Sequence, residues 1–290
     1  MIGLGAIAFD DAELAASFSG SRSELAWIFG PHRAALPRVV QTAQPSAAFP
    51  DGGCYIMRDG ETHVFIDCGP VGLAGRGGHG HNDALSFEAC IEGVPLVTDC
   101  GSYVYTASFE ARNRFRSTVS HNTPFVDSEE INRFAGLGNL WNLHDDARPI
   151  CLEWRTDALE DVFVGCHRGY VRLGVEVRRT IRFDKATRSL EITDGLSGEG
   201  PHDVSIPFHF FPDVAVEQIS AGWKLQSAGM AFNLVIESAQ DWTGQTEPCL
   251  VSPSYGVSVP SRRLVFSSSG TLPKALKITI SPIATAQSRG

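Results

Sequence analysis

The sequence predicts an all-β protein, an antiparallel β-sandwich preceded by a short helical segment. Glycine is frequent, with 29 of 290 residues, which suits a chain with many turns. Many short runs alternate β-branched or aromatic residues with polar ones, and Gly, Asp or Pro separates them. A parallel α/β sheet would require helices between these runs, and the sequence shows no helical stretch there. We therefore expect one large sandwich.

The helical segment is confined to the beginning of the chain. Over residues 10–29 apolar residues recur at three- and four-residue spacing, Asp10 and Asp11 suit a first turn, and Gly30-Pro31 ends the pattern. Residues 37–52 are rich in Pro, Ala, Ser and Gly, which indicates a linker.

These patterns predict two parts of the chain. Residues 1–45 form a helical remnant with its linker, and residues 46–290 form the sandwich.

Two β-hairpins open the predicted sandwich. Two short runs flank Asp59-Gly60, and two more flank Glu92-Gly93, a turn signal in each case. Nine further strand-like runs follow, over residues 149–156, 160–171, 174–184, 188–196, 203–211, 213–219, 231–238, 262–269 and 275–282.

The formal net charge of −9 disfavours a nucleic-acid or anionic-membrane partner. No apolar stretch reaches the roughly 18–20 residues of a membrane span. The apolar start of the chain lacks a basic segment before it, so we expect no signal peptide and a cytoplasmic protein if the chain is complete. Seven cysteines without a CxxC pair predict free thiols and a reducing compartment.

The stretch with the clearest chemistry is GRGGHGHND at residues 75–83. His79 and His81 are two residues apart, so an extended backbone would turn both imidazoles toward one cavity. The surrounding glycines allow the backbone to approach a ligand closely. Two histidines in such a loop fit either a binding site or a structural role.

Asp99 and His121 extend this set. Asp99 ends an apolar strand-like run, and His121 lies just before another one. Two histidines and a carboxylate are a ligand set for Zn²⁺, and also for Fe²⁺ or Mn²⁺. Spacing alone leaves open whether the three residues meet, and Asp99 by itself also fits a turn before Gly101.

A family resemblance becomes specific at residues 77–106, GGHGHNDALSFEACIEGVPLVTDCGSYVYT, and residues 112–127, RNRFRSTVSHNTPFVD. Together they resemble the C-terminal β-sandwich of the heparinase II/III-like polysaccharide lyases. The similarity covers residues 50–135 closely. It implies an enzyme class that cleaves acidic polysaccharides, such as heparan sulfate or alginate, by β-elimination.

The resemblance also implies roles for individual residues. His81, Asp99 and His121 match the metal ligands of the family, and the metal is usually zinc in a structural role. His79 matches a histidine of the catalytic cleft. If the chain is part of such a lyase, the periplasm or the cell envelope is the expected location.

This sequence departs from the family pattern before the sandwich. The family carries its catalytic tyrosine on a preceding helical toroid, whereas residues 10–36 here resemble only the last helix of that toroid. We expect the chain to lack the base, to be inactive or impaired alone, and to need the toroid as a partner. The nearby phenols, Tyr103 and Tyr105, are predicted to pack against the sheet.

Arg112, Arg114 and Arg116 alternate along the chain, and an extended segment would place them on one side. With Arg133 they could give an acidic protein a positive groove that binds a polyanionic substrate. A solvated face, with Glu110, Glu129 and Glu130 nearby, explains the pattern equally well.

Three other readings compete with the lyase. The first is a non-catalytic carbohydrate-binding or structural sandwich in which a metal holds a loop. A cupin-type oxygenase also uses His-x-His, but Leu85 and Ser86 stand where its Glu is expected and Glu88 comes too late. An amidohydrolase needs a βα-barrel, and no helical sequence pattern follows residue 50.

Overall fold

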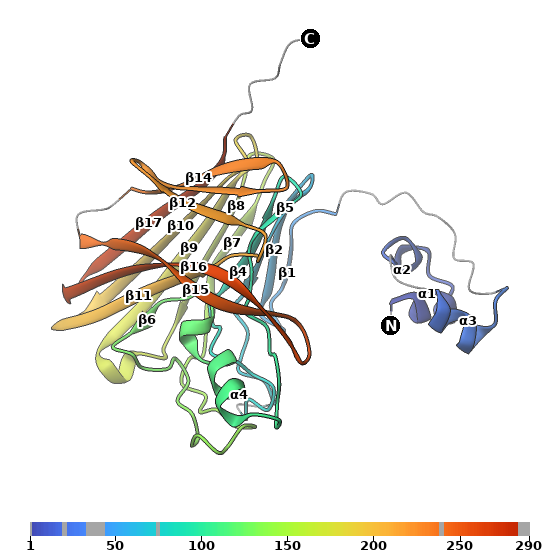
Figure 1. Ribbon diagram of the computed structural model, residues 1–290, viewed down its shortest axis with the longest axis horizontal. Coiled ribbons are helices and arrows are strands. Elements are labelled where there is room, and N and C mark those ends of the chain that lie inside the picture. Colours follow the sequence, from blue (N-terminus) through green and yellow to red (C-terminus); the bar gives the residue numbers. More distant parts are fainter. Residues whose placement is uncertain (1, 19–21, 33–43, 74–75, 238–240, 284–290) are drawn as a thin grey trace, which may run out of the picture. The chain divides into compact units, whose positions relative to one another are not determined.

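The computed structural model describes residues 2–18, 22–32, 44–73, 76–237 and 241–283. The chain divides into two compact units, Met1–Gln44 and Pro45–Gly290, which we describe separately (Figure 1). Residues 37–43 of the predicted linker lie outside the described residues.

The first unit contains three short helices, α1 (Ile2–Phe9), α2 (Ala12–Ala16) and α3 (Ser23–Phe29). The predicted helical segment is confirmed, but residues 10–29 contain two helices instead of one pattern, and α1 lies before the predicted stretch. Asp10 has a positive φ of 54°, which ends the first helix, and the carboxylate of Asp11 accepts hydrogen bonds from two backbone N–H groups and caps the second. Buried Ile7 and Leu25 form a small core of their own.

The second unit consists of three sheets, whose described strand pairs are all antiparallel (Figure 1). The five-stranded sheet follows the chain through β1 (Ala47–Phe49), β2 (Cys54–Asp59), β3 (Thr62–Asp67), β4 (Phe87–Ile91) and β5 (Val94–Val97). The eight-stranded sheet has the order β12 (Ala215–Ile219), β13 (Gly222–Ser227), β14 (Met230–Ile236), β17 (Lys274–Pro282), β10 (Ser189–Gly198), β9 (Val175–Asp184), β8 (Glu160–His167) and β7 (Ile150–Thr156). The four-stranded sheet has the order β15 (Thr243–Ser254), β16 (Val257–Thr271), β11 (Pro201–His209) and β6 (Phe125–Val126).

The all-β fold class is therefore confirmed. Both predicted hairpins form, as β2–β3 around Asp59-Gly60 and β4–β5 around Glu92-Gly93, and each of the nine further runs contains a strand. Strand β1 lies inside the stretch predicted as linker, so that prediction is wrong for residues 47–49.

One hydrophobic core connects the three sheets. In β9 every second side chain is buried, which is the pattern of a strand with one face on a core. Aromatic rings pack in this core: the ring of Phe208 in β11 lies 5.2 Å from that of Phe87 in the five-stranded sheet and 5.5 Å from that of Phe266 in its own sheet. This core gives the loops at one end of the sandwich a rigid base.

Two further sequence expectations concern the cysteines and the membrane. All seven cysteines are free thiols, and three of them are buried. Among the helices of the described residues, none has the length and apolar character to cross a membrane.

Candidate metal centre and the surface beside it

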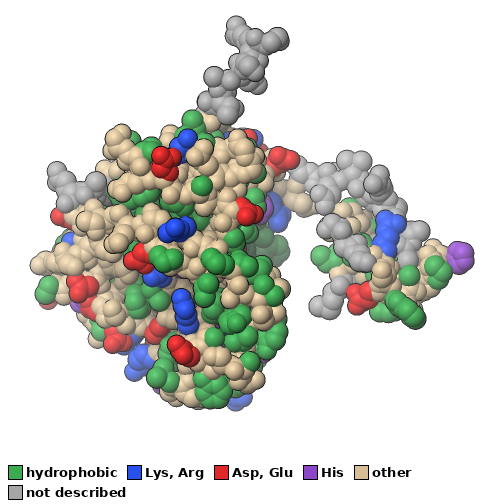
Figure 2. Space-filling view, in the orientation of Figure 1, with side chains coloured by type: hydrophobic (Ala, Val, Ile, Leu, Met, Phe, Trp, Pro, Cys, Tyr) green, Lys and Arg blue, Asp and Glu red, His purple; other side chains and the backbone are tan. Residues whose placement is uncertain are grey.

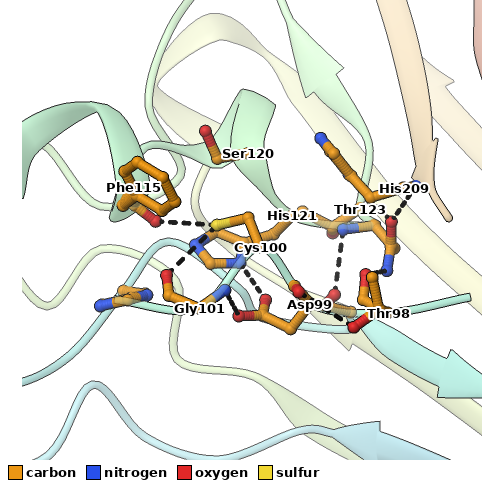
Figure 3. Close-up of polar contacts among 12 residues, drawn as sticks. Thr98, Asp99, Cys100, Gly101, Phe115, Ser120, His121, Thr123 and His209 are labelled. Atoms are coloured by element: carbon orange, nitrogen blue, oxygen red, sulfur yellow. Dashed lines mark hydrogen bonds and ion pairs between the residues drawn. The ribbon is translucent and has the colours of Figure 1, made fainter. Parts of the chain in front are cut away.

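Asp99 and His121 meet at the end of the sandwich. Asp99 follows β5, and His121 ends the short 3₁₀ helix η2 (Thr118–Ser120). The His121 Nδ1 lies 2.5 Å from the Asp99 Oδ2, and the two side chains face each other (Figure 3). The other carboxylate oxygen accepts a 2.7 Å hydrogen bond from the Gly101 N–H. Gly101 has a φ of 77°, and a Cβ there would lie 2.3 Å from the Ser252 carbonyl oxygen, so this turn requires glycine.

His81 completes the group. Its ring centre lies 5.2 Å from that of His121. One ligand atom from each of His81, Asp99 and His121 lies within 4.8 Å of the other two. Within the described part of the chain, this is the one group of three such side chains close enough to hold a metal ion. Residues 18 and 22 positions apart in the sequence thus converge on one point.

Burial and charge give the three side chains different proton affinities. Burial alone would lower the pKa of His121, but the charge and hydrogen bond of Asp99 outweigh it and raise the pKa to about 9. Burial opposes ionisation of Asp99 as well, yet His121 holds the pKa of that carboxyl at about 2. For His81, burial and the neighbouring His121 lower the pKa to about 3, so its ring is neutral at pH 7.

The three residues fit a bound metal. The buried His121 Nε2 has no hydrogen-bond partner among the described residues. Two imidazoles and a carboxylate are the donor set that Zn²⁺ accepts, and zinc would replace the proton on whichever His121 nitrogen it binds. His81 Nε2 accepts a 2.7 Å hydrogen bond from Arg112, which can only donate, so a metal must bind the other ring nitrogen or displace the guanidinium.

Buried Asn122 holds the Asp99 and His121 segments together. Its amide N–H group donates to the carbonyl oxygens of Phe87, at 2.9 Å, and Thr98, at 2.8 Å. Its side-chain oxygen accepts from the His209 N–H at 2.7 Å. The guanidinium of Arg179, itself paired with Asp194 in the core, donates to the Asn122 carbonyl oxygen. One side chain therefore joins β4, β5 and β11 directly beneath the two ligands.

Glu130 connects the loop that carries His81 to the segment that carries His121. One of its carboxylate oxygens accepts from the Asn82 side chain at 2.8 Å and from the Thr118 N–H at 2.7 Å. Asn82 follows His81 and Thr118 begins η2, so the His81 loop is bound to the segment that carries His121. The sequence analysis gave Asn82 and Asn122 no role and considered Glu130 only as part of a solvated face, because isolated polar residues carry no periodic signal.

Residues 109–115 form a helix, α4 (Phe109–Phe115), so the prediction of an extended arginine segment is wrong. The Ser108 hydroxyl caps it by accepting from the Ala111 N–H. Helical spacing buries Arg112 and Arg116 on one side and leaves Arg114 exposed. Arg116 donates to Asn113 and to carbonyl oxygens of the loop after it. Arg133 pairs with Asp146 instead of joining this group.

His79 lies in other surroundings than His81. It is exposed, and its ring centre lies 5.3 Å from those of both Tyr105 and Trp141. Tyr105 also lies over the Arg112 guanidinium, at 5.0 Å, so the prediction that Tyr105 packs against the sheet is wrong. The ring of Tyr103 contacts Phe115 of α4.

A cavity of about 220 Å³ lies on another side of Asp99. Asp67, Asp83 and Glu88 line it together with Asp99. Burial, with the charge of Asp83, raises the pKa of Asp67 to about 7, and burial also raises the pKa of Asp83 and Glu88. Asp67 ends β3 and Asp83 lies in the loop after the histidines, whereas Glu88 lies within β4, and no sequence pattern marked the three as a group.

The fold and the site together define a β-sandwich with a candidate metal centre at one end. The chain belongs to the heparinase II/III-like family: the model "Heparinase II/III-like, C-terminal" matches residues 41–281. A comparison with curated proteins found no match.

Solved structures share the fold at low sequence identity. The heparan sulfate lyase HepC from Pedobacter heparinus has a TM-score of 0.71 and 18% identity, over 96% of this chain and 43% of that one. A heparinase III has a TM-score of 0.71 and 14% identity, over 95% of this chain and 44% of that one. This chain thus spans less than half the length of these relatives.

Proposed function

We propose that this chain is the metal-binding sandwich domain of a polysaccharide lyase that cleaves uronic-acid-containing polysaccharides by β-elimination. His81, Asp99 and His121 hold a structural Zn²⁺, and His79 contacts the substrate. The observation that carries the proposal is the arrangement of the two histidines. His81 lies within the buried ligand group, whereas His79, two residues before it, is exposed.

The chemistry of β-elimination explains the role given to His79. The proton at C5 of a uronic acid is removed while negative charge develops on the carboxylate, so a donor near that carboxylate stabilises the transition state. An exposed imidazole can donate such a hydrogen bond. Arg112, Arg114 and Arg116 were predicted to bind the polyanion; Arg114 is exposed, and Arg112 lies behind Tyr105.

A base and an acid are also required, and we propose that a helical toroid supplies them as a partner of this domain. The first unit supports an association with further helical structure, because Phe9 is 80% and Trp27 89% exposed. Alone, the chain is expected to bind acidic polysaccharide and to cleave it poorly. The periplasm or the cell envelope is the location that this function implies.

Binding and turnover test the proposal together. Calorimetry with uronate oligosaccharides from heparan sulfate and alginate should detect binding that His79→Ala weakens while zinc content stays unchanged. The ultraviolet absorbance of unsaturated uronates should reveal little product from the chain alone. Failure to bind any uronate oligosaccharide would contradict the function, and robust turnover by the chain alone would contradict the need for a partner.

A non-catalytic carbohydrate-binding or structural sandwich is the second candidate. The observation in its favour is that Asn122 and Glu130 brace all three ligand segments within the sandwich itself. In that case His79→Ala would leave oligosaccharide affinity unchanged, whereas removal of zinc would lower the melting temperature.

A further inference from the structure

Three aromatic rings beside His79 form a surface that we call the ring platform, made of Tyr105, Trp141 and Tyr255. The centre of the Tyr105 ring lies 5.5 Å from that of Trp141 and 5.7 Å from that of Tyr255. The plane of the Tyr105 ring is tilted by only 31° from that of Trp141 and by 32° from that of Tyr255. Figure 2 shows hydrophobic side chains gathered at the end of the sandwich unit that carries α4.

The three rings come from separate segments that backbone hydrogen bonds hold in place. Tyr255 lies in the turn between β15 and β16, where the Gly256 N–H donates to the Tyr103 carbonyl oxygen at 2.8 Å. Beyond Trp141, the Leu143 N–H donates to the Arg76 carbonyl oxygen at 3.1 Å, which attaches this loop to the histidine loop. Backbone hydrogen bonds between the segments therefore fix the positions of the rings.

Exposure distinguishes the platform from a core cluster. Trp141 is 40% exposed and Tyr255 is 65% exposed, whereas the aromatic residues of the sandwich core are buried. A single exposed aromatic residue needs no explanation, but adjacent exposed rings mark a binding surface. Flat aromatic faces pack well against the C–H face of a pyranose ring, which is apolar while its hydroxyl edge stays in water.

The charge next to the platform favours an anionic occupant. The Arg112 guanidinium lies 5.0 Å from the centre of the Tyr105 ring. Its Nε and Nη2 have no hydrogen-bond partner among the described residues, and no ion pair of Arg112 occurs there. An uncompensated buried cation attracts negative charge to the nearby surface, and exposed His79 adds a hydrogen-bond donor at the edge of the rings.

We propose that the ring platform binds an acidic polysaccharide, with the C–H faces of pyranose units on the exposed rings of Trp141 and Tyr255 and an anionic group toward Arg112 and His79. The substrate class rests on the proposed function. The platform itself rests on the ring geometry. It places the sugar next to His79, where the reacting carboxylate has to lie.

Oligosaccharide binding by the full chain tests this proposal. The probe is a heparan sulfate tetrasaccharide, measured by calorimetry beside a neutral cellotetraose. Because each alanine variant loses a ring contact with the sugar, Trp141→Ala should weaken binding about tenfold, which is about 1.4 kcal/mol, and Tyr255→Ala several-fold. Trp141→Phe and Tyr255→Phe keep a ring and should bind within about twofold of the wild type.

Trp27→Ala is the matched control, because Trp27 is an exposed tryptophan of the first unit and should not affect binding. Equal zinc content and melting temperature exclude misfolding of the platform variants. Unchanged affinity in both alanine variants, no binding by the wild type, or equal affinity for cellotetraose would overturn the proposal. Ring-dependent binding that His79→Ala leaves intact would instead retain the platform and remove the proposed role of His79.

Discussion

The two faces of the histidine loop differ in how the protein supports them. On the metal side, His121 and Asn122 are fully buried, and side-chain hydrogen bonds join the surrounding strands. On the proposed substrate side, His79, Trp141 and Tyr255 are exposed and lie on loops. The sandwich by itself fixes the proposed ligands, whereas the rings and His79 are left for a ligand or a partner to cover. Stability and binding should therefore separate between the two faces.

Removal of a proposed ligand should have the largest effect. His121→Ala takes away one of three donors and leaves the Asp99 carboxylate without its partner, so zinc affinity should fall by about a hundredfold or more. Competition with a chromophoric chelator measures this affinity. His79→Ala is the control and should bind zinc as the wild type does. An equal loss of zinc affinity in both variants would contradict the claim that only the His121 side of the loop binds the metal.

Asn122→Ala should destabilise the protein by about 3 kcal/mol, because it leaves the carbonyl oxygens of Phe87 and Thr98 and the N–H of His209 buried without partners. Urea denaturation of the metal-free chain gives the free energy of unfolding. Asn142→Ala, which removes a single contact with Asn139, should cost less than about 1 kcal/mol. Similar losses in the two variants would show that Asn122 is not a brace.

Zinc affinity should rise with pH. His121 has its pKa raised to about 9, so below that pH the metal must displace its proton, and each unit of pH changes the apparent affinity up to about tenfold. In the metal-free protein, by contrast, a rise in pH above 6.5 lowers the stability of the fold. The His121–Asp99 attraction stabilises the fold fully between pH 3.8 and 6.5, the ordinary pKa values of the two groups, and is lost as the pH rises through 9 or falls through 2. An affinity independent of pH between 6.5 and 8.5 would contradict this coupling.

The smallest effect is expected on the substrate side. His79→Ala and Trp141→Ala should each change the free energy of unfolding by less than about 0.5–1 kcal/mol, because both side chains are exposed. Thermal unfolding with zinc present measures this. A loss comparable to that of Asn122→Ala would mean that the rings support the fold.

Local sequence patterns predicted the elements whose faces alternate. The β2–β3 and β4–β5 hairpins have a turn signal between two alternating runs, so both were found. Helix α4 was missed because its alternating arginines also fit a strand. Ser108 as N-cap, with Arg112 and Arg116 four residues apart, was the helical signal available.

The convergence of His81, Asp99 and His121 could not follow from spacing, since it depends on how β5 and η2 fold onto the histidine loop. Family motifs pointed to these residues, and the structure brings them within 4.8 Å. The ring platform had no sequence signal at all. Its rings come from positions 36 and 114 residues apart in the chain, and only the tertiary fold unites them.

Metal analysis of the purified chain beside His81→Ala tests the central claim most directly. Elemental analysis after dialysis against zinc should find about one zinc per chain in the wild type and little in the variant, with both chains folded by circular dichroism. Equal zinc content in the two proteins, whether near one per chain or far below it, would contradict a metal centre formed by His81, Asp99 and His121.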